Sequence, residues 1–399
     1  MKQILSVVLI SQAAFAAGLP GILLGDGEWS GAVGARAFAM GGVELMDASA
    51  LGSLTNPAAA ASAGPGITVQ LAGGMDVLVE KRTRTVYDSF ESSIGEAEHA
   101  FNRSSPLIPG GLALTLSRTG GMPDALSIAL GWVERASFGY SYDRTIRNDY
   151  YVTTGEERLE IDGCVGEACA SAAMTFSDLV TVGLGGGWLS GSRDTRWTRN
   201  WIDPSIPDTD EASSSDLSGM VGRASVVVSP REDLSVSLGV EKAMSVSWTG
   251  DSAGDLELPP RIRAGAEWLP GNALRSRFVA EVSYYAASGA EFDGSDMGMR
   301  DCWSACAGLE NHIPGGPACR FGFRYDKSPV SRALDSVSFT GGMGFSVAGM
   351  RLDAGASFTP RCWDQQDIPL LPSFADGDTL GVEETVTALR ISASRAFSL

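Results

Sequence analysis

The stretch VSFTGGMGFSV, residues 337–347, places large apolar side chains on every second residue with one exception. These side chains are Val337, Phe339, Met343, Phe345 and Val347, and Ser, Thr or Gly fills the positions between them. Successive side chains of a β-strand point to opposite faces of the sheet. The stretch therefore predicts a strand with one apolar face and one small, polar face.

The alternation continues beyond this stretch. After the dipeptide Ala348-Gly349, the sequence MRLDAGASF at 350–358 repeats it, and two such runs around a tight turn indicate a β-hairpin. The same pattern recurs in LSIALGW (126–132), VTVGLGGGW (180–188), SVSLGVEK (235–242), RIRAGAEW (261–268) and RFGFRY (320–325). Roughly 14 to 16 such runs are present, most about 8 to 12 residues long, which suits tilted strands that cross a bilayer.

The composition of the 399-residue chain excludes several classes of protein. No stretch of about 18 consecutive apolar residues is present, which excludes a membrane protein built from helices. The formal net charge of -18 excludes a basic surface for nucleic acid, and it argues against a polybasic anchor for anionic lipid headgroups.

The amino terminus resembles a secretory signal. Lys2 precedes an apolar run at residues 4–10, and Ala14-Phe15-Ala16 fits a cleavage site for signal peptidase. We therefore expect residues 1–16 to be a signal peptide and the protein to be exported.

Two folds fit exported, alternating strands: a soluble β-sandwich and a transmembrane β-barrel. The apolar faces carry Trp, Tyr and Phe near the strand ends, as expected where strands meet membrane interfaces. The last strand, TALRISASRAFSL (387–399), ends close to Phe397 and resembles the signal that the barrel assembly machinery recognises. These features favour an all-β, transmembrane antiparallel β-barrel in the cell outer membrane, in contact with outer-membrane lipid.

Several motifs, in order along the chain, resemble the FadL family of outer-membrane transporters for long-chain fatty acids and other hydrophobic compounds. They are GARAFAMGG (34–42), DASALGSLTNPAA (47–59), SDLVTVGLGGGWLSGS (177–192), LSVSLGVEKAMSVSWTGD (234–251), LELPPRIRAGAEWLP (256–270) and DCWSACAGLENHIPGGPACRFGFRYDKSPV (301–330). The resemblance implies a barrel of about 14 strands at residues 65–399, with a first strand near Ile67. It also implies a monomer.

The resemblance further implies that residues 17–64 form a hatch inside the barrel, ending at the turn Asn56-Pro57. The small residues Gly34, Gly41, Gly42 and Gly52 would allow close packing there. The apolar side chains of this segment either bind a lipid tail or pack against the inner wall. They are Phe38, Met40, Leu45, Met46 and Leu54.

Two further stretches are candidates for ligand contact. In VYDSFESSIGEAEHAF (86–101), apolar residues at three- and four-residue steps predict one face of a helix at the rim, which either catches a solute or caps the rim. They are Tyr87, Phe90, Ile94, Ala97 and Phe101. The acidic segment 191–216 is expected to be a solvated loop, with a divalent cation site as the alternative.

The six cysteines permit disulfides in an oxidising compartment. Cys164 and Cys169 flank a short segment predicted to be a turn and are one candidate pair, and Cys302 and Cys362 are another. The spacing of Cys and His matches no metal site, and no catalytic motif is present. We therefore expect no metal, no cofactor and no enzymatic activity.

The sequence supports two functions. One is passive uptake of a hydrophobic small molecule, a fatty acid or a hydrocarbon. The other is a shuttle or assembly role in type IX secretion, because the amino-terminal motif also resembles PorV-type barrels. A structural surface barrel is the third alternative.

Overall fold

The computed structural model describes residues 33–398 apart from 89, 91, 106, 121–122, 148–151, 178, 252 and 367–378. The expected signal peptide and residues 17–32 of the expected hatch lie outside the described residues. The hairpin at 337–358 is confirmed. Strands β17 (Ser336–Val347) and β18 (Met350–Gln366) pair from Val347↔Met350 onward, and both turn residues have positive φ. Positive φ at both central residues matches the right-handed twist of a hairpin.

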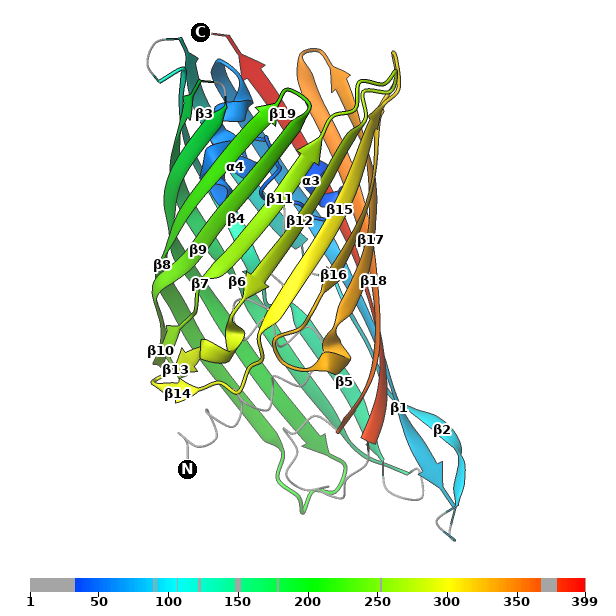
Figure 1. Ribbon diagram of the computed structural model, residues 1–399. Helices are drawn as coiled ribbons and strands as arrows, with labels where there is room; N and C mark the ends of the chain where they lie inside the picture. The colour runs from blue at the N-terminus through cyan, green and yellow to red at the C-terminus, as the bar shows by residue number, and fades with distance from the viewer. Residues whose placement is uncertain are drawn as a thin grey trace.

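In the described part of the chain, fourteen strands form a closed antiparallel barrel (Figure 1). Besides β17 and β18 they are β1 (Gly66–Tyr87), β3 (Leu107–Thr119), β4 (Ala125–Ser137), β6 (Thr153–Phe176), β7 (Val180–Trp201), β8 (Thr209–Arg231), β9 (Leu234–Gly250), β11 (Arg261–Trp268), β12 (Arg277–Tyr285), β15 (Cys302–His312), β16 (Ala318–Asp326) and β19 (Thr379–Phe397). The last strand closes the ring by pairing with β1 from Ile67↔Phe397 to Arg84↔Leu380. The expected start of the first strand near Ile67 is therefore confirmed.

Shorter elements extend the wall at one end of the barrel. They are β2 (Ser93–Ser104), β5 (Tyr140–Arg147), β10 (Gly254–Glu257), β13 (Glu291–Phe292), β14 (Ser295–Asp296) and the 3-10 helices η2 (Ala287–Gly289) and η3 (Arg332–Leu334). This end also carries the tip of the β7–β8 hairpin, and we call it the long-hairpin end. No described helix is long and apolar enough to cross a membrane.

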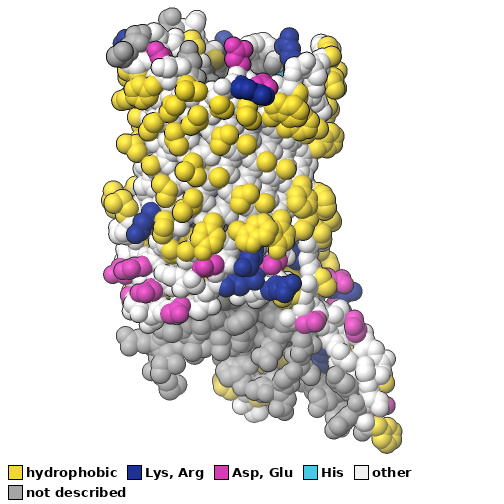
Figure 2. All heavy atoms as spheres, viewed as in Figure 1, with side chains coloured by type: hydrophobic (Ala, Val, Ile, Leu, Met, Phe, Trp, Pro, Cys, Tyr) yellow, Lys and Arg dark blue, Asp and Glu magenta, His cyan; other side chains and the backbone are white. Residues whose placement is uncertain are grey.

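The predicted apolar face points outward. Leu126, Ile128, Leu130 and Trp132 of β4 are all exposed, while Ala129 between them is buried. On the face of the molecule seen in Figure 2, hydrophobic side chains form a band across the wall. A soluble sandwich would bury this face, so the band confirms the prediction of a transmembrane barrel.

The helix predicted at 86–101 is wrong. Strand β1 extends to Tyr87 and β2 begins at Ser93, and the two pair from Leu78↔Ser104 to Tyr87↔Ser93. Pairing with β1 overrides the local three- and four-residue spacing, and Gly95 has a φ of +142°, which no right-handed helix contains. Phe90, Ile94 and Phe101 are exposed.

Both proposed disulfides are also wrong. Cys164 and Cys169 lie on one continuous strand, β6, and are free thiols. Five residues of strand span about 16 Å, whereas a disulfide holds its Cα atoms within about 7 Å. Cys302 on β15 and Cys362 on β18 are separated by β16 and β17, which places them about 14 Å apart at the usual strand spacing.

The segment 191–216 is not a loop for most of its length. Strands β7 and β8 continue to Trp201 and Thr209, so only residues 202–208 connect them. Arg196 donates two hydrogen bonds to Asp210 at 3.0 and 2.9 Å, and this contact lowers the pKa of the Asp210 carboxyl.

Candidate functional site

Residues 33–64, which we call the inner segment, lie inside the barrel (Figure 1). The segment contains α3 (Ala35–Phe38), α4 (Gly52–Thr55) and the 3-10 helix η1 (Pro57–Ala63). Helix α3 contacts β17, β18 and β19, whereas η1 contacts β3, β4, β6, β7 and β8. Because these strands lie on different sides of the ring, the segment crosses the lumen, at the end opposite the long hairpins (Figure 1).

Buried ion pairs attach the inner segment to the wall. Arg36 donates to both carboxylate oxygens of Glu310 on β15, at 2.9 and 2.5 Å. Glu44 pairs with Arg263 on β11, and Glu281 on β12 accepts the backbone N–H groups of Glu44 and Leu45 at 2.8 Å each. A charge buried in this way is costly unless paired, so the contacts specify one docked position.

Wall glycines allow the inner segment to approach closely. A Cβ added at Gly308 would lie 2.4 Å from Met40 Cβ and 2.5 Å from Met40 O, and one at Gly183 would lie 2.2 Å from the backbone of Ala58. Real Cβ atoms do not approach other atoms this closely. The sequence interpretation assigned close packing to glycines of the segment itself and missed the glycines of the wall. Runs such as GLGGGW on inward positions were the available signal.

The structure brings the five apolar candidates of the inner segment against the wall. Met40, Leu45, Met46 and Leu54 are buried, next to Gly308, Gly239, Gly265 and Gly131 respectively. Phe38 is partly buried, and the Arg390 guanidinium lies 5.1 Å from its ring centroid. At the turn, Asn56 donates to the backbone oxygen of Leu45, and Pro57 begins η1.

A second group of buried side chains, which we call the outer cluster, fills the other half of the lumen. Its main members are Leu78, Phe138, Tyr140, Tyr142, Leu159, Ile161, Val165, Leu189, Leu217, Val221, Val246, Trp248, Leu256, Tyr285 and Met299. Their inward direction follows from the alternation, since Leu189 is 3% exposed and its neighbour Trp188 is 53% exposed. The sequence interpretation expected the second face of each strand to be small and polar and missed this cluster. The available signal was an inverted alternation, as on β6, where Leu159 and Ile161 point inward and Arg158 and Glu160 lie on the other face.

The wall has a seam beside the outer cluster. The β3–β4 ladder ends at Gly111↔Val133, and beyond it the described residues of β2 and β5 lie side by side without a backbone ladder. Two hydrogen bonds that involve side chains bridge them: Asp143 N–H donates to Asn102 Oδ1 at 2.9 Å, and Arg144 Nη1 lies 2.8 Å from His99 Nε2. The alternation of β4 also fails at this point, because the four residues from 133 to 136 are all buried. Strand β4 therefore bends inward at the seam and brings Phe138 into the lumen.

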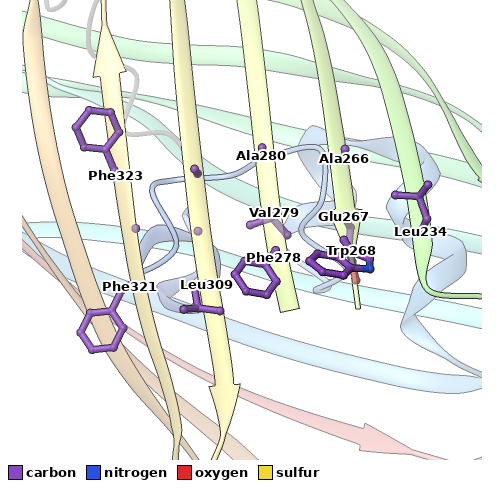
Figure 3. Close-up of a pocket in the computed structure, with 13 residues that line it drawn as sticks. Leu234, Ala266, Glu267, Trp268, Phe278, Val279, Ala280, Leu309, Phe321 and Phe323 are labelled. Carbon is purple, nitrogen blue, oxygen red and sulfur yellow. The ribbon is translucent and has the colours of Figure 1, made fainter. Parts of the chain in front are cut away.

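A pocket of about 570 Å³ lies on β9, β11, β12, β15 and β16. Trp268, Phe278, Phe321 and Phe323 at its edge are exposed on the outer face of the wall (Figure 3). The pocket is therefore a membrane-facing groove and does not belong to the lumen.

Solved structures share this fold. A Pseudomonas aeruginosa FadL homologue superposes with a TM-score of 0.61 at 13% identity, over 91% of this chain and 98% of its own. The P. putida toluene transporter TodX gives 0.61 at 15% identity, over 92% and 99%. The Ralstonia pickettii toluene transporter TbuX gives 0.58 at 16% identity, over 91% and 98%. No family sequence model and no curated protein sequence matches the chain.

Proposed function

We propose that the protein is an outer-membrane channel for passive uptake of hydrophobic compounds, long-chain fatty acids among them. The observation that supports it best is the outer cluster, because a channel for ions or sugars has a polar lumen. Apolar and aromatic side chains give a hydrophobic solute a lower free energy in the lumen than in water.

The proposed path has three parts. The long-hairpin end faces outward, since barrels of this kind place longer loops outside and short turns in the periplasm. A solute enters the outer cluster from this end and then meets the inner segment, which acts as the hatch. It leaves where the hatch moves or where the bent strand opens the seam. The similarity to the FadL homologue and to the toluene transporters supports this order of events through the shared fold.

Uptake by cells tests the proposal. Cells that produce the protein are expected to accumulate labelled palmitate or toluene faster than cells that lack it. Leu217→Gln places an amide in the outer cluster and is expected to reduce uptake, whereas Ile202→Gln, on the exposed connection of the β7–β8 hairpin, serves as the control. Equal uptake with and without the protein would refute the function. A stoichiometric protein partner in the purified material, without any small ligand, would favour the secretion shuttle.

A further inference from the structure

The membrane-facing groove has a floor made of three alanines on neighbouring strands. Ala266 on β11 lies opposite Ala280 on β12, which in turn lies opposite Ala307 on β15. All three line the groove, whose volume is about 570 Å³, and Ala280 and Ala307 are exposed. A methyl group covers little of the backbone beneath it, so this row forms a depression in the apolar band.

Large side chains border this floor on the side of the short turns. The next outward-facing row consists of Leu234, Trp268, Phe278, Leu309 and Phe321, and Phe323 stands at the end of the alanine row. The rings of Trp268 and Phe278 stack with their centroids 5.5 Å apart (Figure 3). The five strands of the groove span about 19 Å at the usual spacing, more than the roughly 15 Å that the acyl chains of one leaflet occupy. The groove is therefore long enough for an acyl chain.

The wall behind the groove is thin, because glycine fills several inward positions of the same strands. Gly265, Gly308 and Gly322 lie on β11, β15 and β16, and the inner segment packs directly on them. A Cβ added at Gly322 would lie 2.1 Å from the backbone nitrogen of Gly41. The inner segment thus supplies packing contacts on the lumen side, whereas the membrane side gains them only when something fills the groove.

We propose that the groove binds an acyl chain of one phospholipid molecule, whose phosphate lies at the β11–β12 turn. This turn, residues 269–276, carries Arg275, which is exposed and forms no ion pair with a described carboxylate. A guanidinium group suits a phosphate, and Trp268 and Phe278 beside the turn match the aromatic belt found at head-group level. A second copy of the chain fits less well, because its barrel would present another convex wall to the groove. The inference rests on the transmembrane barrel and not on the solute that is proposed to pass through it.

Native mass spectrometry of the purified full-length protein tests the inference. The probes are dioleoylphosphatidylglycerol and dioleoylglycerol, which share their acyl chains and differ in the phosphate-containing head group, each titrated in a non-ionic detergent. Wild type is expected to retain one phospholipid molecule, bound about 10-fold more tightly than dioleoylglycerol, as for hydrogen bonds to charged groups. The difference between the two probes measures the contribution of the phosphate.

Two substitutions separate the floor of the groove from the charge at the turn. Ala280→Phe fills the floor and is expected to weaken binding of both probes about 10-fold, since the acyl chain then buries fewer CH₂ groups. Ala354→Phe is the matched control, because Ala354 on β18 is also exposed but lies outside the groove. Arg275→Met is expected to remove the preference for the phospholipid while leaving dioleoylglycerol binding unchanged. Folding of each variant is checked by heat-modifiable mobility on gels.

The outcomes decide between the candidate occupants of the groove. Equal binding of the probes to wild type and Ala280→Phe would overturn the lipid site, as would wild type that retains no phospholipid. A dimer without bound lipid, dissociated by Ala280→Phe, would assign the groove to a second copy of the chain. Equal affinity of wild type for the two probes, or an unchanged preference in folded Arg275→Met, would overturn the placement of the phosphate. None of these outcomes depends on solute uptake, which the cell assay measures separately.

Discussion

Glu310 on β15 holds the inner segment, and we expect Glu310→Gln to release it. The carboxylate is buried and accepts hydrogen bonds from Arg36 at 2.9 and 2.5 Å and from Arg320 at 2.5 Å. Arg351 and His312 approach it at 3.4 and 3.2 Å. An amide offers one acceptor oxygen, carries no charge and turns its NH₂ group toward cations. The substitution therefore breaks the bidentate contact with Arg36.

The size of the effect follows from these contacts. Breaking a buried ion pair costs about 3–5 kcal/mol, and we take the lower figure because the Arg36 side chain is 18% exposed. About 3 kcal/mol raises the population of the released segment roughly 100-fold, at about 1.4 kcal/mol for each tenfold change. Arg36→Met should cost less, because Glu310 then keeps Arg320 and Arg351 as partners.

Limited proteolysis measures the released population, because cleavage follows the open fraction when opening and closing are fast. Trypsin should cut after Arg36 about 100-fold faster in Glu310→Gln than in wild type. Glu160→Gln is the control, since Glu160 pairs with Arg158 on the surface, where such pairs contribute about 0–1 kcal/mol. Equal cleavage rates in wild type and Glu310→Gln would refute the role of this contact in docking.

Two other predictions concern the wall. Gly308→Ala should lower the free energy of unfolding by about 1–3 kcal/mol, because the added Cβ would clash with the Met40 backbone. A urea titration measures this loss. The control is Gly289→Ala, where nothing lies within 4 Å of the added Cβ. Equal midpoints for the two variants would contradict the close packing. Asn102→Ala removes the hydrogen bond from the Asp143 amide, one of the two across the seam. The Asp143 amide should therefore exchange with deuterium about 3- to 10-fold faster, while the amides of β8 keep their rates. An unchanged rate at Asp143 would show that the seam is closed by other means.

The barrel was predictable because each wall residue meets one of two environments, and the period-two alternation records which one. Phe339, Met343 and Phe345 meet lipid whatever the rest of the fold does, so local sequence suffices to identify the strand. The closing strand was likewise visible from Leu389 and Ile391. The same argument fails at residues 86–101, where the strand extends beyond the apolar band and its spacing mimics a helix.

The contacts between side chains inside the lumen depend on the register of neighbouring strands, which the period-two alternation does not specify. Trp248 belongs to β9 and Arg193 to β7. The Arg193 guanidinium carbon lies 4.9 Å from the Trp248 ring centroid, and this contact requires the offset of the β7–β8 and β8–β9 ladders. The cysteine pairs failed for the same reason, since Cys164 and Cys169 were paired without knowledge of the continuous strand that separates them.

The two halves of the lumen bear on the direction in which a solute leaves. The half of the lumen filled by the inner segment contains buried ion pairs such as Arg36–Glu310 and Arg263–Glu44. An apolar solute that passes between the members of such a pair would separate two charges that are buried away from water, which is costly. Opening the seam separates no such ion pair, because the described residues of β2 and β5 share no ladder and are joined by the Asp143–Asn102 and Arg144–His99 hydrogen bonds alone. We therefore expect sideways exit through the seam to have the lower barrier, with the paired charges of the inner segment acting to close the axial path.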